Sequence, residues 1–114
     1  MNITGRGKML KIYLGETEKW HGKTLYHQVV MKLREEGLAW ATVYRGILGY
    51  GADKVIHSAK ILDLSADLPM VIDVIDSEEN IMKVLPVIRE MVPRGLIIVV
   101  DIDIVQYGPY GTGS

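Results

Sequence analysis

The sequence predicts an α+β fold built from two similar halves, each with the order strand, helix, strand. Each half has a helix that ends at an Arg-Glu pair, Arg34–Glu35 in the first and Arg89–Glu90 in the second. A Gly-Leu step and an apolar segment then follow, at Gly37–Leu38 and at Gly95–Leu96. The order β-α-β-β-α-β is typical of the split β-α-β, or ferredoxin-like, plan. Right-handed crossovers then place two helices on one face of a four-stranded antiparallel sheet.

The elements of the first half follow from the spacing of its apolar residues. Residues 9–15 alternate between an apolar and a mixed face, which predicts a strand. Residues 25–36 carry leucine and valine at i, i+4 and i+8, which predicts a helix. Thr24 is its candidate N-cap and Gly37 its stop. The second strand is expected over residues 38–48.

The second half begins with a segment of mixed pattern. Residues 52–64 are compatible with a short helix or with the start of a strand, and we expect a mobile loop that contains a partial element. A strand is predicted over residues 70–75. Ser77 is the candidate N-cap of a second helix with a strong apolar stripe, in which Pro86 should cause a bend. The last strand is expected over residues 96–105.

The bulk composition limits the class of protein. The 114 residues suit one domain, with flexible tails expected at residues 1–8 and 108–114 and with Tyr107 and Tyr110 as candidate anchors. A net charge of -1 does not favour nucleic-acid binding, and the absence of cysteine excludes disulfides, thiolate zinc sites and cysteine nucleophiles. Because no apolar run approaches the length of a transmembrane segment, we expect a cytoplasmic protein.

The last two strands are apolar on both faces. The segments are PMVIDVID at residues 69–76 and GLIIVVDIDIV at residues 95–105. Such continuous apolar runs are typical of strands that are buried on both sides. Two helices cover only one face of the sheet, so another copy of the chain is the simplest cover for the second. The sequence therefore predicts a homo-oligomer.

The run ATVYRGILGYG at residues 41–51 is the first candidate binding element. Arg45 lies between a predicted strand and three closely spaced glycines, Gly46, Gly49 and Gly51. Successive backbone N–H groups and a guanidinium suit a phosphate or a carboxylate, so this run is a candidate anion cradle. The alternative is a bulged strand end that requires glycine for conformational reasons.

Two further polar residues are candidate ligand contacts. His57 lies in the same loop and is a candidate ligand contact or pH sensor, with a solvated loop histidine as the alternative. Arg94 precedes Gly95 at the end of the second helix. This arginine is positioned either to reach a ligand phosphate or to complement the helix C-terminus.

Three acidic residues raise the question of cation binding or acid-base chemistry. Asp101 and Asp103 alternate with isoleucine and share a strand face, and Asp73 lies on another strand. The alternative is that these acids lie at a rim or pair with lysine or arginine across a subunit contact. His21 and His27 are not spaced as an i, i+4 metal pair. Because no nucleophile with a base and an orienting group is apparent, we do not expect an enzyme.

Three segments resemble domain-of-unknown-function family 190, also called UPF0166. They are GLAWATVYRGILGYG at residues 37–51, IHSAKILDLSADLPMVIDVID at residues 56–76 and GLIIVVDIDIVQY at residues 95–107. The resemblance covers roughly residues 8–107. Its most specific parts are the RG-x-x-G-[FY]-G run and the LS-x-DLP-x-VI-x-V-x-D run.

The resemblance implies a PII-like protein. The resemblance also implies a trimer, in which strands pack around a threefold axis and ligands bind in clefts between subunits. By position, residues 46–60 would form the mobile loop and residues 93–95 the loop after the second helix. The implied ligand-binding residues are Arg45, Gly46, Gly49, Tyr50, Gly51, His57, Arg94 and Gly95.

These implications define two functional hypotheses. The first is a homotrimeric signalling protein that binds a small anionic ligand and switches its mobile loop toward a regulated partner protein. An adenine nucleotide is the candidate ligand, and no other cofactor is expected. The alternative is a metal-ion-binding trimer that is similar to the copper-tolerance proteins and uses His57 with carboxylates.

Overall fold

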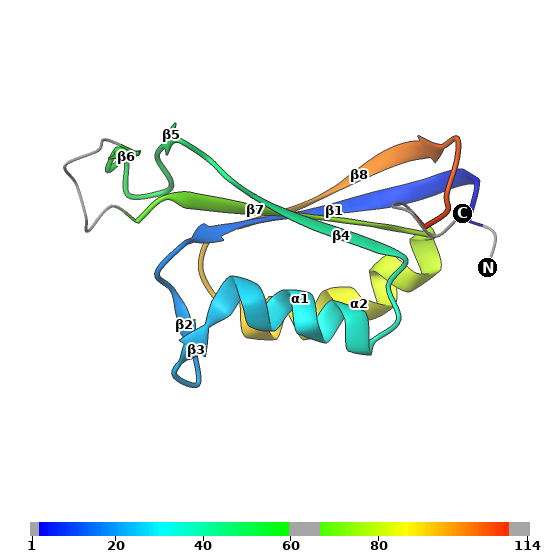
Figure 1. Ribbon diagram of the computed structural model, residues 1–114, viewed down its shortest axis with the longest axis horizontal. Helices are drawn as coiled ribbons and strands as arrows, with labels where there is room; N and C mark the ends of the chain where they lie inside the picture. Colours follow the sequence, from blue (N-terminus) through cyan, green and yellow to red (C-terminus); the bar gives the residue numbers. More distant parts are fainter. Residues whose placement is uncertain (1–2, 60–66, 110–114) are drawn as a thin grey trace.

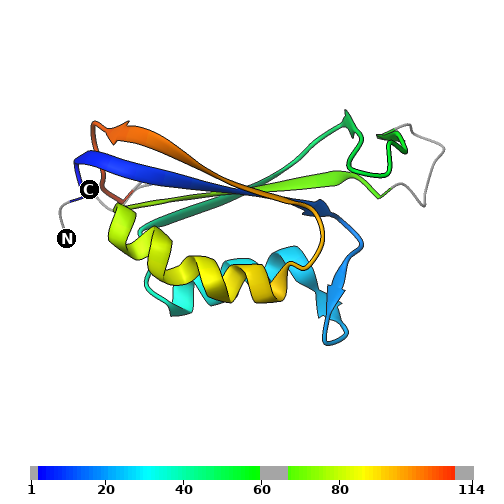
Figure 2. The same cartoon turned by 180° about the vertical axis from the view of Figure 1, so that it is seen from behind.

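A computed structural model describes residues 3–59 and 67–109. The main sheet has four strands: β1 (Gly5–Gly15), β4 (Trp40–Arg45), β7 (Pro69–Asp76) and β8 (Leu96–Ile104). They lie in the order β4-β7-β1-β8, and all neighbouring pairs are antiparallel. Helices α1 (Leu25–Glu35) and α2 (Glu78–Met91) lie side by side on one face (Figures 1 and 2). The predicted ferredoxin-like plan is confirmed. Neither helix in these residues is long or apolar enough to cross a membrane.

The hydrophobic core lies between the helices and the facing side of the sheet. Its most deeply buried side chains alternate along the two central strands and recur along the helices. They include Leu10, Ile12, Ile72, Val74, Val29, Leu33, Ile81 and Ile88. Each fully buried aliphatic side chain of this kind stabilises the fold by roughly 1.5–3 kcal/mol. The helical stripes predicted from the sequence therefore form the core.

Helix α1 ends as predicted but begins differently. Gly37 adopts a φ of 80°. Its N–H donates to the Arg34 carbonyl at 3.0 Å, and the Leu38 N–H donates to the Leu33 carbonyl at 3.1 Å. This is a Schellman ending, which favours glycine. At the other end, Thr24 occupies the N-cap position without a side-chain capping bond, so its predicted capping role is wrong.

Helix α2 begins at a buried polar junction. The Ser77 hydroxyl accepts from the Asn80 N–H at 3.2 Å, which confirms the predicted cap. The preceding residue, Asp76, is fully buried, and its carboxylate accepts from the backbone N–H groups of Ala39 at 2.9 Å and Ser77 at 2.6 Å. The Asn80 side chain donates to the same carboxylate at 3.1 Å. Asp76 therefore joins the start of β4 to the start of α2.

Two predictions for the N-terminal half are wrong. Strand β1 starts at Gly5 rather than residue 9, because its first residues pair with the end of β8, from Gly5 opposite Ile104 to Lys8 opposite Asp101. Residues 5–8 therefore belong to the sheet and not to a tail. Before α1, strands β2 (Lys19–Trp20) and β3 (Lys23–Thr24) form a hairpin that the sequence pattern did not predict. His21 and Gly22 have φ values of 50° and 78°, as a tight hairpin turn requires.

The strand expected over residues 38–48 is interrupted. Strand β4 ends at Arg45, and β5 (Leu48–Gly49) instead pairs with β6 (His57–Ser58). The break occurs at Gly46, whose N–H donates to the Pro69 carbonyl at 2.7 Å. A Cβ atom at Gly46 would lie 2.8 Å from Pro69 Cγ, so only glycine allows this approach.

Strands β5 and β6 form a small ribbon that projects beyond one end of the main sheet (Figure 1). For residues 52–64 the sequence was compatible with a helix or a strand, and the structure has a strand, β6, within this segment. The rest of that prediction includes residues 60–64, which lie outside the described residues. Of the predicted C-terminal tail, residues 110–114 also lie outside them.

The C-terminal segment after β8 returns to the start of β4. The Tyr107 hydroxyl donates to the Ala39 carbonyl at 3.2 Å. Its ring meets the Trp40 ring edge-on, with the ring centroids 6.5 Å apart. Tyr107 is therefore an anchor, as the sequence predicted.

Candidate functional site

The predicted ligand-binding residues all lie at one end of the main sheet, here called the loop end. Strands β1 and β4 end there, and β7 and β8 begin there, as the antiparallel pairing requires. Arg45 and the glycine ribbon extend from β4, whereas Arg94 and Gly95 precede β8. These are the two outermost strands, separated by β7 and β1. With strands about 4.8 Å apart, the two groups lie about 14 Å from each other in one chain.

Arg45 is exposed and already has an acidic partner. Its Nη1 atom lies 3.1 Å from the Glu16 Oε2 atom. Glu16 follows directly after β1, and its backbone N–H donates to the Leu68 carbonyl at 2.9 Å. The sequence pattern does not indicate Glu16 as a partner, because 29 residues separate it from Arg45. Only the sheet order brings the ends of β1 and β4 close together.

The ribbon brings several of the predicted residues together. Gly49 lies directly opposite His57 across the β5–β6 pair. The next turn begins after Tyr50, where the Lys54 N–H donates to the Gly51 carbonyl at 3.0 Å. The Lys54 Nζ atom lies 5.3 Å from the centroid of the Tyr50 ring. The ribbon therefore combines a lysine, a histidine and an aromatic ring near the glycines.

The ribbon also exposes large apolar side chains. The exposed side chains are those of Ile47, Leu48, Tyr50, Val55 and Ile56. Ile47 is 76% exposed and Ile56 is 68% exposed, so neither contributes to the core. Exposed apolar groups that gather in one place are typical of an interaction surface. The alternating strand pattern of the sequence did not reveal this cluster.

Gly95 has a packing role that is independent of any ligand. Its φ is 100°, a conformation that side chains rarely adopt. A Cβ atom at this position would lie 2.2 Å from the Tyr13 carbonyl oxygen. Glycine therefore allows the chain to pass close to β1 before β8 begins. The neighbouring Arg94 is exposed at the surface.

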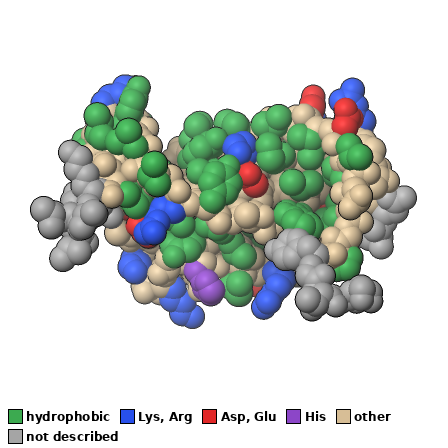
Figure 3. Space-filling model, turned by 45° about the horizontal axis from the view of Figure 1, so that its top comes forward, with side chains coloured by type: hydrophobic (Ala, Val, Ile, Leu, Met, Phe, Trp, Pro, Cys, Tyr) green, Lys and Arg blue, Asp and Glu red, His purple; other side chains and the backbone are tan. Residues whose placement is uncertain are grey.

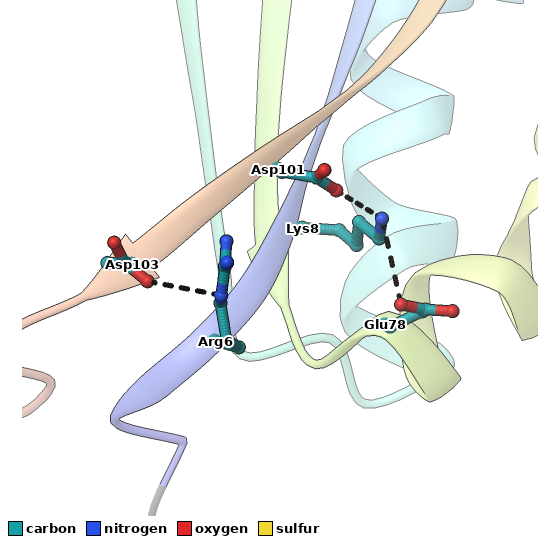
Figure 4. Close-up of polar contacts among 5 residues, drawn as sticks. All are labelled: Arg6, Lys8, Glu78, Asp101 and Asp103. Carbon is teal, nitrogen blue, oxygen red and sulfur yellow. Dashed lines mark hydrogen bonds and ion pairs between the residues drawn. The ribbon is translucent and has the colours of Figure 1, made fainter.

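Asp101 and Asp103 pair with basic residues of β1 at the opposite end of the sheet. The Lys8 Nζ atom contacts the Asp101 carboxylate and lies 3.6 Å from Glu78 Oε2 (Figure 4). The Arg6 Nε atom lies 3.7 Å from Asp103 Oδ1. The Lys8 ammonium donates to Asp101 and so lowers the pKa of that carboxyl group, and the same contact raises the pKa of Lys8. The alternative reading of these acids as partners of lysine and arginine is correct, although the pairs form within one chain.

Asp73 does not join these acids. It lies opposite Lys11, whereas Asp101 lies opposite Lys8, so the register places the two acids on opposite faces of the sheet. The predicted combination of three carboxylates is therefore wrong. Within residues 3–59 and 67–109, no group of three or more histidines and acids is arranged to hold a metal ion.

The sheet face opposite the helices is largely apolar, as the sequence predicted (Figure 3). The strand register assigns to it Trp40, Thr42, Tyr44, Val71, Asp73, Ile75, Met9, Lys11, Tyr13, Leu96, Ile98, Val100 and Ile102. Within this face, Tyr44 is 44% exposed and Leu96 is 53% exposed. Both helices lie on the other face of the sheet (Figures 1 and 2). We refer to this surface as the open face.

Comparison with known sequences identifies the family. The sequence profile of DUF190, described as "Uncharacterized ACR", matches residues 7–104. The chain belongs to the DUF190 family. A UPF0166 protein of Methanocaldococcus jannaschii is 43% identical over 97 residues, which cover 84% of this chain and 89% of the relative. A UPF0166 protein of Aquifex aeolicus is 38% identical over 98 residues, which cover 86% and 92%.

Comparison with solved structures identifies the fold of this DUF190 chain as PII-like. It resembles CPII, a nitrogen regulatory PII-like protein from Thiomonas intermedia K12, whose structure holds ADP, AMP and bicarbonate. The TM-score is 0.67 and the match covers 89% of this chain and 90% of CPII. The sequence identity is 18%, so this similarity concerns the fold.

Proposed function

We propose that this DUF190 chain is a PII-like regulator that binds a small anionic ligand between the subunits of a homotrimer. One observation carries the proposal: the basic and glycine-rich elements occupy the two outer strands of a sheet whose open face is apolar. Within one chain, Arg45 and Arg94 belong to outer strands that β7 and β1 separate by about 14 Å. An arrangement around a threefold axis would cover the open face and bring the β4 side of one copy near the β8 side of the next.

The chemistry of these elements favours an anion. Arg45 offers a planar guanidinium that suits phosphate or carboxylate. Gly46 and Gly49 let the backbone approach a ligand closely. Tyr50 and His57 add flat rings, which suit stacking on a base. An adenine nucleotide combines an anionic phosphate with a base that can stack on a ring. CPII, which shares the fold, holds ADP and AMP in its structure.

The β5–β6 ribbon is the proposed switch. The 2.7 Å bond from the Gly46 N–H to the Pro69 carbonyl joins the base of the ribbon to the main sheet. A ligand at the base of the ribbon would restrain the loop over residues 46–60 and reorient the exposed Ile47 and Ile56. A regulated partner protein would then bind one orientation of this apolar cluster and not the other, as in other order–disorder switches.

The test combines assembly with ligand binding. Sedimentation velocity at micromolar concentration should show a trimer. Calorimetric titration with AMP, ADP, ATP and cyclic AMP should show saturable heat for at least one nucleotide. Limited proteolysis should show slower cleavage of residues 46–60 in the presence of that nucleotide. A monodisperse monomer, or the absence of both heat and protection with all four nucleotides, would contradict the proposal.

A further inference from the structure

An ion pair lies in the middle of the open face, on the two central strands of the sheet. The Lys11 Nζ atom donates to Asp73 Oδ1 at 2.7 Å and to the Tyr44 hydroxyl oxygen at 3.0 Å. It also lies 6.0 Å and 5.7 Å from the ring centroids of Tyr13 and Tyr44. The side chains of Lys11 and Asp73 are only 16% and 21% exposed. The flanking rings therefore shield the pair from water even in a single chain.

This cluster retains hydrogen-bonding capacity that its contacts within the described residues do not use. A lysine ammonium has three N–H donors, and two of those of Lys11 are engaged by contacts within the described residues. Among the contacts of the described residues, the Tyr44 hydroxyl accepts from Lys11, which leaves its own O–H as a donor. Among the same contacts, Asp73 accepts through Oδ1, which leaves Oδ2 as an acceptor. The cluster thus offers both donors and an acceptor, with no net charge.

We propose that Lys11, Asp73 and Tyr44 form the polar centre of a contact between copies of this chain and set the register of that contact. The occupant of the open face is a second copy because the cluster is self-complementary. The remaining donors of one copy match the remaining acceptor of the next, and a rotational axis repeats this match in every copy. The inference rests on the homotrimer of the proposed function, and it adds the residues that determine its geometry.

The surrounding residues explain why such a polar centre is needed. Leu96 and Ile98, which are 53% and 37% exposed, provide apolar area that favours association. Apolar burial is not directional, so it would allow two sheets to slide over each other. A buried polar group in an apolar contact restricts the register because every other alignment leaves it without partners. The ion pair is already largely dehydrated, so covering it removes little further hydration.

The test uses single and paired substitutions at this cluster. Lys11→Met leaves the Asp73 carboxylate unpaired in the contact, so the association constant should fall at least tenfold in sedimentation equilibrium. Lys11→Arg retains the charge and should restore most of the association. Lys11→Met combined with Asp73→Leu removes the ion pair and leaves the Tyr44 hydroxyl as the single polar group of the cluster, and should give assemblies that are stable but heterogeneous in size. Lys32→Met is the control, because Lys32 pairs with Glu35 and Glu36 on the opposite, helical layer.

Circular dichroism of each variant separates loss of assembly from loss of folding. If folded Lys11→Met assembles as tightly as the wild type, the proposed role of the cluster is wrong. A single homogeneous trimer from the double variant would also overturn it. If the wild type assembles through these residues but binds none of the four nucleotides, the ligand assignment fails and the inference stands. A monomeric wild type would overturn both.

Discussion

Arg45 Nη1 lies 3.1 Å from Glu16 Oε2, so the arginine predicted to bind an anion is paired with a carboxylate of its own chain. The two side chains extend from the ends of β4 and β1, on either side of the start of β7. An anionic ligand that uses Arg45 would have to displace or share this carboxylate. Glu16 would therefore weaken the binding of anions and favour those with a higher charge.

Substitutions at this pair should change nucleotide affinity in opposite directions. Arg45→Ala removes a charged hydrogen-bond donor, so the Kd of the best-binding nucleotide should rise about tenfold or more. Glu16→Gln removes the competing charge, and the Kd should fall by up to about fivefold, as expected for an exposed ion pair. Isothermal titration calorimetry measures both changes.

Sedimentation velocity of the same two variants should still show the wild-type assembly. If Arg45→Ala instead dissociates the assembly, Arg45 is an interface residue and the anion-cradle interpretation fails. If Arg45→Ala weakens binding but Glu16→Gln does not strengthen it, the proposed competition by Glu16 is wrong, whereas the anion-cradle interpretation of Arg45 stands.

Gly95 should be far more sensitive to alanine than a glycine in an open turn. Gly95→Ala places a Cβ atom 2.2 Å from the Tyr13 carbonyl oxygen at a φ of 100°. The free energy of unfolding should fall by about 2 kcal/mol or more, since backbone strain and a clash combine. Gly22→Ala is the matched control, because Gly22 has a φ of 78° but no atom within 4 Å of the added Cβ.

Urea unfolding followed by circular dichroism compares the two glycine variants. The control should lose about 1 kcal/mol, the cost of a positive φ without a clash. Equal losses in both variants would show that the close approach to Tyr13 does not determine the need for glycine at residue 95.

The Lys8–Asp101 pair should contribute to stability only within a limited pH range. Because Lys8 lowers the pKa of Asp101, the stabilisation from this carboxylate is present above its usual pKa of about 3.9 and is lost as the pH falls through the lower folded value. Because Asp101 raises the pKa of Lys8, the stabilisation from the lysine is present below about 10.4 and is lost as the pH rises through the higher folded value.

The variant Asp101→Asn tests this pH dependence. At pH 7 its melting temperature should be slightly lower than that of the wild type, because both partners are exposed to solvent screening. The difference should shrink as the pH falls below about 3.9 and vanish once the wild-type carboxyl group is protonated in the folded state. Differential scanning calorimetry from pH 2 to pH 8 measures it. A difference of the same size at pH 2 and pH 7 would assign it to packing and not to charge.

Local pattern was sufficient to predict most of the fold. The apolar alternation of β1 and the stripes of α1 and α2 are properties of a few neighbouring residues, and they establish the element types without any long-range information. The apolar character of both faces of β7 and β8 likewise predicted the open face. The glycine after α1 and the serine before α2 were identified for the same reason, since capping involves only adjacent residues.

The pairing of distant residues depended on the tertiary structure. Arg45 meets Glu16, and Lys11 meets Asp73 across 62 residues, because the antiparallel register aligns them. The same register separates Asp73 from Asp101. Both acids lie within apolar strands, but on opposite faces of the sheet. Strand β1 extends to Gly5 because the end of β8 supplies backbone hydrogen-bond partners, which the N-terminal sequence alone does not indicate.

Gly95 illustrates the same distinction. Its place after a helix suggested a ligand loop, but the carbonyl that requires glycine there belongs to Tyr13, at the far end of the chain. A sequence pattern reports the preferences of neighbouring residues, which are short-range. The register of a sheet is decided by backbone hydrogen bonds and by the burial of one face, and these act between segments that only folding brings together.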